Sequence, residues 1–382
     1  MRHFNMLTDY DLKTFFKYSP VEFSRDSERE TLGLALGAAL YTPGSRPDFA
    51  AKILAGEYTE GAFAGLATLI VCLEDAVADS ELPWAEKNVA AQLKKIKKVD
   101  FYQKNNDLAL FLRIRNAEQL DRLIHIAGSA LGVLTGIVFP KCLPGNLVEF
   151  FPALDRASEA AGRTLYALPI LETKEILYSE TREQTLNDIY DILRSEINRV
   201  LTVRVGATDF SSLYGLRRPV DRTIYEVHVI RDCLISILNR FNRADDGFVV
   251  SGPVYEYFSS ANGGWMSSKP EKVLWEEVQM DVLNGFIGKT CIHPSQISIV
   301  NAGHIVSQEN YEDALLILSE SQKRNGVLQS PKRNKMNEVK PHLSWAKRIA
   351  AQAEVYGVLN ENYQPIDVLN HIRANRFSNQ LL

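Results

Sequence analysis

The segment TLIVCLED, residues 68–75, is an apolar run that ends in two adjacent carboxylates. A short apolar run bounded by charged residues is typical of a strand that is buried on both faces of a sheet. Outward from this segment the chain contains further runs of the same kind, and together they predict eight strands. The predicted strands are 34–41, 68–73, 108–114, 136–139, 165–171, 201–205, 248–250 and 285–292.

Helical patterns lie between these strands. The segments that are long and periodic enough for helices are 85–98, 117–131, 186–198, 221–242 and 271–284. Strands that alternate with helices predict a parallel sheet, and eight such units predict closure into a TIM (β/α)8 barrel. A doubly wound open sheet is the main alternative. It normally carries a glycine-rich turn after its first strand, and PGSRPD at 43–48 is not such a turn.

The character of the sequence changes after the eighth strand. Residues 308–323 and 342–356 predict two more helices, separated by the polar segment 329–341, which predicts an exposed linker or a mobile loop. We therefore expect a barrel domain with an N-terminal extension over residues 1–325. A C-terminal helical extension over 326–382 would act as a lid or as a subunit contact.

Composition excludes several classes of protein. The 382 residues include 43 Lys and Arg against 47 Asp and Glu, so the net charge of -4 gives no overall attraction to nucleic acid. No apolar stretch reaches the length of about 18 residues that spans a bilayer, and the N-terminus lacks the apolar run of a signal peptide. The four cysteines, Cys72, Cys142, Cys233 and Cys291, form no CxxC pair that would suggest a metal knuckle. We expect a cytoplasmic protein that binds neither nucleic acid nor membranes.

Polar residues that follow the strands are the first candidates for a site, because active sites of parallel barrels form at the C-terminal ends of the strands. Those residues are Glu74, Asp75, Arg113, Arg115, Lys141, Glu172, Asp209, Lys289 and His293. Glu172 and Asp209 follow neighbouring strands and offer oxygen ligands, which favours a hard divalent cation, most simply Mg²⁺. The alternative is that each carboxylate caps the helix that follows it.

The remaining candidates also have two interpretations each. Arg113 suits bidentate contact with a substrate carboxylate, or a salt bridge to Glu74 or Asp75. Glu74 and Asp75 are costly to bury unless they are paired or lie near a metal, so a supporting role beside the metal is favoured. The His-Pro step at His293 favours a structural turn over catalysis.

Several ordered motifs resemble those of the HpcH/HpaI aldolase and citrate lyase beta-subunit family. They are LYTPGSRPDFAAK at 40–52, LIVCLEDAVADSE at 69–81, LRIRN at 112–116, GIVFPK at 136–141, PILET at 169–173, VGATDF at 205–210 and GFIGKTCIHPSQI at 285–297. Within this superfamily the chain is most similar to a divergent carbon–carbon bond lyase branch associated with bacterial tellurite-resistance and stress-response gene clusters. The resemblance implies a TIM barrel in trimers or hexamers. It also implies that Mg²⁺, or Mn²⁺, helps to cleave or form a bond beside a carboxylate or an acyl-CoA thioester.

The resemblance also implies roles for individual residues. It makes Glu172 and Asp209 the metal ligands and lets Glu74 and Asp75 support the metal site. Arg113 would bind the carboxylate of a 2-oxo acid. With Arg115 and Lys141 it forms the predicted binding set for a small acidic substrate.

A further catalytic residue is implied in the C-terminal tail. Lyases of this kind need a proton donor or acceptor, and in related malyl-CoA lyases a lid carries an aspartate that reaches a neighbouring subunit. The PID sequence at 365–367 places Asp367 at the matching position. The alternative is that Asp367 is an ordinary cap of the last helix.

The sequence departs from the family at two places. The first strand of relatives commonly opens with Arg-Ser, and here Gly37 and Ala38 stand instead, while Arg115 adds a positive charge in RIRN. These departures leave open whether acyl-CoA is a co-substrate. The alternative function is a barrel that has lost its chemistry and serves as a metal-binding or ligand-binding component of a stress-response complex.

Overall fold

The computed structural model describes residues 1–99, 108–259, 268–321 and 326–380. Eight strands, each parallel to its neighbours, pair in the order β8-β7-β6-β5-β4-β3-β2-β9. A parallel bridge between Gly252 and Lys289 joins the two end strands, so the sheet closes and the predicted TIM barrel is confirmed. The strands are β2 Ala38–Pro43, β3 Thr68–Cys72, β4 Ala109–Arg113, β5 Gly136–Phe139, β6 Tyr166–Leu171, β7 Val203–Val205, β8 Val250–Ser251 and β9 Lys289–Cys291.

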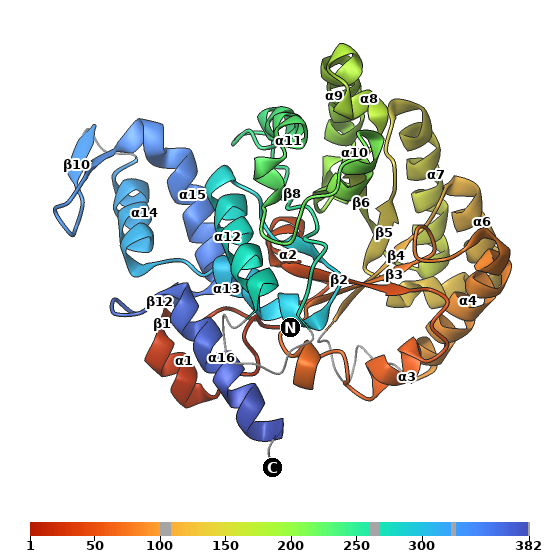
Figure 1. Ribbon diagram of the computed structural model, residues 1–382, viewed down its shortest axis with the longest axis horizontal. Coiled ribbons are helices and arrows are strands. Elements are labelled where there is room, and N and C mark those ends of the chain that lie inside the picture. Colours follow the sequence, from red (N-terminus) through yellow and green to blue (C-terminus); the bar gives the residue numbers. More distant parts are fainter. Residues whose placement is uncertain (100–107, 260–267, 322–325, 381–382) are drawn as a thin grey trace.

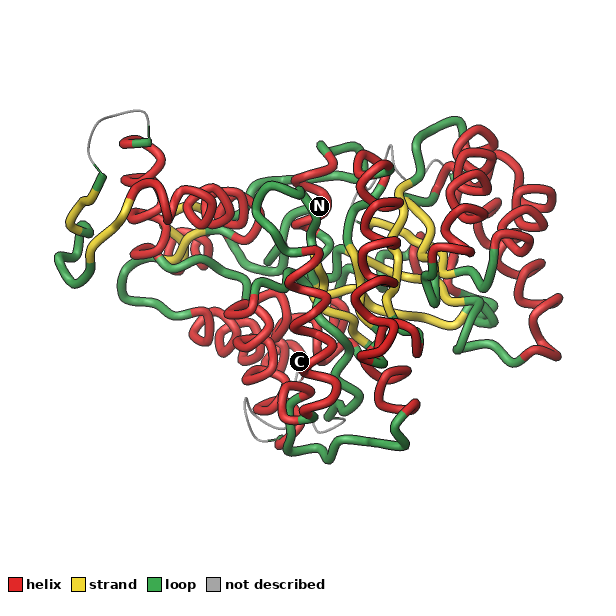
Figure 2. Tube along the Cα trace, turned by 90° about the horizontal axis from the view of Figure 1, so that it is seen from above, coloured by secondary structure: helices red, strands yellow, loops and turns green. Residues whose placement is uncertain are grey.

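Alternation along each strand divides the core into two layers. Ala39, Ile70, Phe111, Val138 and Leu168 pack together inside the barrel. The residues between them face outward, against the helices that surround the strands (Figure 2). These helices are α3 Phe49–Leu54, α4 Leu82–Lys98, α6 Ala117–Ala127, α7 Pro144–Ala161, α8 Lys174–Leu177, α9 Ser179–Ser195, α10 Ala207–Leu213, α11 His228–Phe241, α12 Lys269–Asn284 and α13 Ile297–Gly303.

The first predicted strand begins too early. Leu34 and Ala35 end a helix, α2 Arg29–Ala35, and the strand starts only at Ala38. Between them Gly37 has a φ of 55°, a left-handed conformation that ends the helix and turns the chain into the barrel. Both pieces are buried, so a continuous apolar run conceals the boundary between them. The eighth predicted strand is likewise shortened to Lys289–Cys291.

Two predicted helices have different bounds. The helix predicted at 186–198 is α9 and begins at Ser179, because its first two turns are polar and carry only one buried residue, Arg182. The helix predicted at 221–242 is α11 and begins at His228. A short 3₁₀ helix, Ile224–Glu226, precedes it and is closed by reciprocal capping between Thr223 and Glu226.

The C-terminal extension packs beside the barrel, together with the N-terminal helix α1 Asp9–Phe15 (Figure 1). Its elements are β10 Val327–Gln329, β11 Met336–Glu338, α15 Val339–Tyr356, β12 Val358–Leu359 and α16 Pro365–Gln380, and α14 Gln308–Glu320, which precedes the extension, packs against α15. Strand β1 Phe16–Tyr18 pairs antiparallel with β12, so the two ends of the chain are joined. Helix α16 packs against α13. The predicted helix 308–323 ends, within the described residues, at Glu320, and its last two residues lie outside them.

The polar segment predicted as a linker or mobile loop is mostly ordered structure. Residues 329–341 contribute to a β10–β11 hairpin and to the first turn of α15. Lys335 of the hairpin lies 2.6 Å from the buried carboxylate of Asp313 on α14, and Asn337 donates a hydrogen bond of 2.8 Å to the same side chain. These contacts to a buried acid explain why a polar segment is held in place.

No helix of the described residues is long and apolar enough to cross a membrane. All four cysteines lie within the described residues, and each is buried and free of disulfide bonds.

Lys289, a candidate because it flanks the eighth strand, faces the helices rather than the barrel interior. Its buried ammonium lies 2.9 Å from Glu277 and 2.7 Å from Asp281, both on α12. Glu277 also pairs with the buried guanidinium of Arg218, which in turn lies 2.6 Å from Glu256. Within this network every buried charge has an opposite partner, so Lys289 fixes α12 against β9.

We predict that Glu277→Gln lowers the free energy of unfolding by about 3–5 kcal/mol, because it leaves two buried cations with too little negative charge. Urea unfolding followed by circular dichroism measures the loss. The neighbouring Glu276 is exposed, and Glu276→Gln should change stability by less than about 0.5 kcal/mol. Equal stability of the two variants would contradict a structural role for the network.

Candidate active site

A cavity of about 570 Å³ opens at the C-terminal ends of the barrel strands. Four of the predicted site residues line it: Asp75, Arg113, Glu172 and Asp209. A second cavity of about 540 Å³ lies at the opposite end of the barrel, near Tyr166 at the start of β6, and none of the predicted residues lines it. The strand-end rule thus points to the end of the barrel at which the first of these cavities opens.

Arg113 is the centre of an ion cluster at this cavity. It ends β4, is buried, and directs its Nη2 atom toward three carboxylates. Nη2 lies 2.5 Å from Glu74, 3.1 Å from Asp75 and 3.2 Å from Glu172. The predicted salt bridges to Glu74 and Asp75 are present, and Arg113 also lines the cavity, so the two interpretations of this residue are compatible.

Lys141 supplies the second cation of the cluster. Its ammonium pairs with Glu74 and lies 3.5 Å from Asp75 and 3.7 Å from Asp209. Its backbone N–H donates a hydrogen bond of 2.9 Å to Glu172. Lys141 has a φ of 48°, which is unfavourable for a residue with a side chain. This backbone conformation lets Lys141, just after β5, contact both Glu172 and Asp209.

Glu172 is the most perturbed carboxyl group of the site. Burial, together with the nearby charge of Asp209, raises its pKa to about 7, and Arg113 and Lys141 oppose this rise. The first residue after β7, Gly206, leaves the space that this carboxylate fills, because a Cβ atom at Gly206 would collide with the Glu172 side chain. The sequence VGATDF therefore places a glycine where Glu172 and Asp209 approach each other.

The donor set fits a hard divalent cation. Among the described residues, no group of three or more His, Cys, Asp or Glu side chains is arranged around one metal position. Glu172 and Asp209 instead offer two carboxylates from adjacent strands, and the charge of Asp209 contributes to the raised pKa of Glu172. Mg²⁺ is commonly held by one or two carboxylates and completes its shell with water or substrate oxygens. Two carboxylates beside a cavity match that requirement.

Arg115 lies outside the cavity, although it was predicted to bind substrate. Its guanidinium donates hydrogen bonds to the backbone carbonyls of Leu73, at 3.0 Å, and Val77, at 2.5 Å, and pairs with Asp79. These groups belong to the segment that follows β3. The additional arginine of RIRN therefore holds the segment that carries Glu74 and Asp75, and its donors are used within the chain.

Asp367 also lies away from the cavity of its own chain. It occupies the first turn of α16, where its carboxylate accepts a hydrogen bond of 2.7 Å from the backbone N–H of Gln364. This contact is the capping role given above as the alternative, although the helix begins two residues earlier than Asp367. A role in the cavity of a neighbouring subunit stays a prediction.

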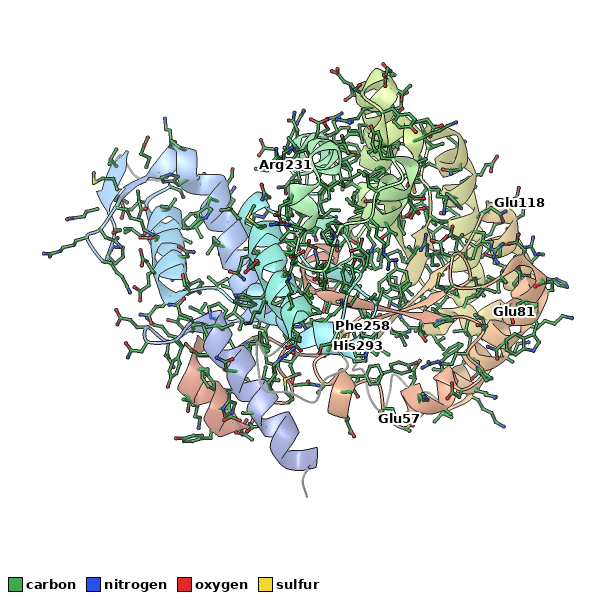
Figure 3. All side chains as sticks on the ribbon, viewed as in Figure 1. Glu57, Glu81, Glu118, Arg231, Phe258 and His293 are labelled. Atoms are coloured by element: carbon green, nitrogen blue, oxygen red, sulfur yellow. The ribbon has the colours of Figure 1, made fainter. Side chains whose placement is uncertain are left out.

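His293 adopts the structural turn that was favoured. Its Nδ1 atom lies 2.9 Å from the hydroxyl of Ser295, and its ring stacks on Phe258 with centroids 4.3 Å apart (Figure 3).

Two cavity residues were not predicted. Arg204 and Tyr41 lie within strands β7 and β2 instead of after them, and both line the cavity. The available signal was an arginine inside the otherwise apolar run LTVRV at 201–205. Burial raises the pKa of the Tyr41 phenol, although the charges of Arg204 and Arg113 lower it, so both cations lie near this ring.

Comparisons with known proteins agree with this fold. No curated protein matches the sequence. A solved structure of CitE from Mycobacterium tuberculosis, in complex with magnesium, acetoacetate and coenzyme A, is 20% identical with a TM-score of 0.54, covering 84% of this chain and 99% of that chain. A second structure, citrate lyase beta subunit from M. tuberculosis with oxaloacetate and magnesium, is 20% identical with a TM-score of 0.47, covering 72% and 98%. RipC from Yersinia pestis is 17% identical with a TM-score of 0.47, covering 71% and 95%.

At 20% identity and a TM-score of 0.54, the first of these structures shows the fold alone. The family is shown by a sequence model described as C-C bond lyase of the TIM-barrel fold, which matches residues 30–358. The match includes every barrel strand and the whole ion cluster of the cavity. The chain therefore belongs to the family of carbon–carbon bond lyases of the TIM-barrel fold.

Proposed function

We propose that this lyase uses Mg²⁺ held by Glu172 and Asp209 to cleave or form a carbon–carbon bond beside the carbonyl group of a small 2-oxo acid. One observation carries the proposal. Among the described residues of the ion cluster, four carboxylates, Glu74, Asp75, Glu172 and Asp209, face two cations, Arg113 and Lys141. When all four are ionised, the cluster has an excess of two negative charges, which one divalent cation would balance.

The chain's own residues have distinct tasks in this proposal. Glu172 and Asp209 hold the cation, which when bound supplies Lewis-acid polarisation of a carbonyl oxygen. Arg113 binds the carboxylate of the 2-oxo acid from the cavity wall and is itself held in place by Glu74 and Asp75. Lys141 balances the two supporting carboxylates and keeps Glu172 in position through its backbone N–H.

Proton transfer requires a further group, because the carboxylates of the cluster are engaged with cations. The resemblance assigns this task to Asp367 of a neighbouring subunit in a trimer or hexamer. Helix α16 supports that assignment in one respect. Arg373, further along the helix, lies 2.7 Å from Glu271 and donates a hydrogen bond of 3.1 Å to the carbonyl of Ser295, just after β9. The helix thus runs past the barrel rim.

The proposal predicts Mg²⁺-dependent aldol cleavage or condensation with at least one member of a panel of 2-oxo acids, tested with and without acyl-CoA. Glu172→Gln and Asp209→Asn should each weaken Mg²⁺ binding by about 100-fold or more in calorimetry and abolish turnover, because each removes an anionic ligand. Glu180 is exposed on α9, and Glu180→Gln is the matched control that should retain both properties. Unchanged metal affinity in the two site variants would contradict the proposal.

Metal binding should depend on pH through Glu172. Its raised pKa of about 7 means that a proton competes with the cation below that pH, so affinity should rise by about tenfold for each pH unit up to 7 and then level off. In the metal-free protein, the contribution of Glu172 to folding stability changes with pH in the opposite direction to the Mg²⁺ affinity. The group favours the folded state below its ordinary pKa of 4.5, and this contribution is lost as pH rises through about 7. Calorimetry and thermal unfolding from about pH 5 to 8 measure both trends. Mg²⁺ affinity that is constant over this range would refute the assignment.

For Asp367 we predict that Asp367→Asn abolishes turnover and leaves Mg²⁺ binding unchanged. Mixing this variant with Arg113→Ala should restore part of the activity, because a mixed oligomer contains some cavities with both native residues. Loss of the Gln364 cap alone would lower stability by about 1 kcal/mol and could not produce complementation. Full activity of Asp367→Asn would rule out the catalytic role.

A further inference from the structure

Arg204 is a buried cation that has no carboxylate partner within the described part of the chain. Its side chain points into the barrel from the middle of β7 and lines the cavity, and the residue is 2% exposed. Nη2 donates a hydrogen bond of 2.6 Å to the hydroxyl of Thr290 on β9. Nε is buried and has no partner. Among the described residues, no carboxylate forms an ion pair with this guanidinium.

Other buried cations of this chain are compensated. Arg113 meets three carboxylates, Arg218 meets Glu256 and Glu277, and Lys289 meets Glu277 and Asp281. Removing a cation from water without an opposite charge is costly, so folded proteins rarely do it without a functional reason. Arg204 therefore differs from these cations in needing an anion that the described part of the chain does not supply.

The position of Arg204 relative to the proposed metal site is fixed by the strand register. Arg204 pairs with Ile170 on β6, and Glu172 follows Ile170 by two residues. Because a strand rises about 3.3 Å per residue, the backbone positions of Arg204 and Glu172 differ by one inward-facing position, about 7 Å along the strand. Glu172 lies at the rim of the cavity and Arg204 lies deeper, toward its floor. A short molecule can contact both.

The surroundings of Arg204 suit an oxyanion. Thr42 lines the same cavity, and its buried hydroxyl has no hydrogen-bond partner. Tyr41 adds a phenol that lies within the electrostatic influence of Arg204. A guanidinium offers two parallel N–H donors that match the geometry of a carboxylate or phosphoryl group. An unused N–H of Arg204, its positive charge and the unused hydroxyl of Thr42 thus belong to the lining of one cavity.

We infer that Arg204 binds a second oxyanionic group of the substrate, at the end remote from Glu172 and Asp209. The substrate would then be a 2-oxo acid that carries a further carboxylate or phosphoryl group. This inference rests on the proposed function for the metal-binding end of the ligand. Binding at Arg204 can nevertheless be measured without turnover.

A structural role is the rival explanation, because the Arg204–Thr290 hydrogen bond spans from β7 to β9 across the short strand β8. The two explanations predict opposite effects on stability. An arginine that holds the barrel closed stabilises the metal-free and ligand-free protein. An arginine kept for an absent anion destabilises it, so a neutral side chain of similar size should leave the melting temperature equal or higher.

The test compares three probes on full-length protein saturated with Mg²⁺: 2-oxopentanoate, 2-oxoglutarate and phosphonopyruvate. The first two have the same chain length and differ by one carboxylate, and the third carries a phosphonate. We expect calorimetry to show that at least one dianion binds about tenfold or more tightly than 2-oxopentanoate. Arg204→Gln should lose that preference, keep its affinity for 2-oxopentanoate and melt no lower than the native protein without ligands. The preferred dianion identifies the second group as carboxylate or phosphoryl.

Arg156→Gln is the control, because it removes an exposed arginine of α7 that does not line the cavity, and it should retain the preference. The inference is overturned if the native protein does not prefer either dianion, if Arg204→Gln keeps the preference, or if Arg204→Gln fails to fold or melts several degrees lower. Failure of the proposed function looks different. In that case none of the three acids binds in a Mg²⁺-dependent way, whichever residue stands at position 204.

Discussion

The site depends on the burial of the Arg113 guanidinium among three carboxylates. Through a single nitrogen this side chain joins the ends of β3, β4 and β6, because Glu74, Asp75 and Glu172 all approach Nη2. Glu74 and Glu172 are buried, so their carboxylates would be costly to hold at the mouth of a barrel without that charge. Arg113 thus fixes the geometry from which Glu172 and Asp209 face the cavity, and Lys141 completes the arrangement from the next strand.

The chain contains two buried ionic networks with different properties. Around Lys289 every charge has a partner, and the network lies between β9 and α12, where it holds the barrel together. At the cavity the charges are not balanced. Carboxylates exceed cations at the rim, and Arg204 on the inner wall has no carboxylate partner among the described residues. Imbalance of this kind costs stability, and it is expected where a metal ion and an anionic ligand later complete the set.

Much of the barrel could be predicted from the sequence, because fully buried parallel strands leave short apolar runs and their ends converge at one face. That single rule brought together Glu74, Arg113, Lys141, Glu172 and Asp209. The prediction was wrong where a helix and a strand, both largely buried, form one continuous apolar run. Leu34 and Ala35 belong to a helix, although their apolar run continues into β2 across Gly37.

Cavity residues inside the strands were also missed by the strand-end rule. Arg204 and Tyr41 precede the ends of β7 and β2, so only their inward direction, which the register determines, places them in the cavity. For Arg115 the rule made the opposite error, because it predicted a binding residue that does not line the cavity. It follows β4 as the rule requires, yet its donors are satisfied by Leu73, Val77 and Asp79 in the adjacent segment. The position of a residue in the sequence indicates the end of the barrel at which it lies. Its hydrogen-bond partners determine whether its side chain is free to contact a ligand.

The central claim is that Glu172 and Asp209 form one divalent-cation site. Crystals of the full chain soaked in Mn²⁺, measured at a wavelength where manganese scatters anomalously, test it most directly. The account predicts one dominant anomalous peak within about 2.0–2.3 Å of an oxygen of each carboxylate, the range typical of a small divalent cation. A dominant peak elsewhere in the molecule, with none between Glu172 and Asp209, would contradict the claim.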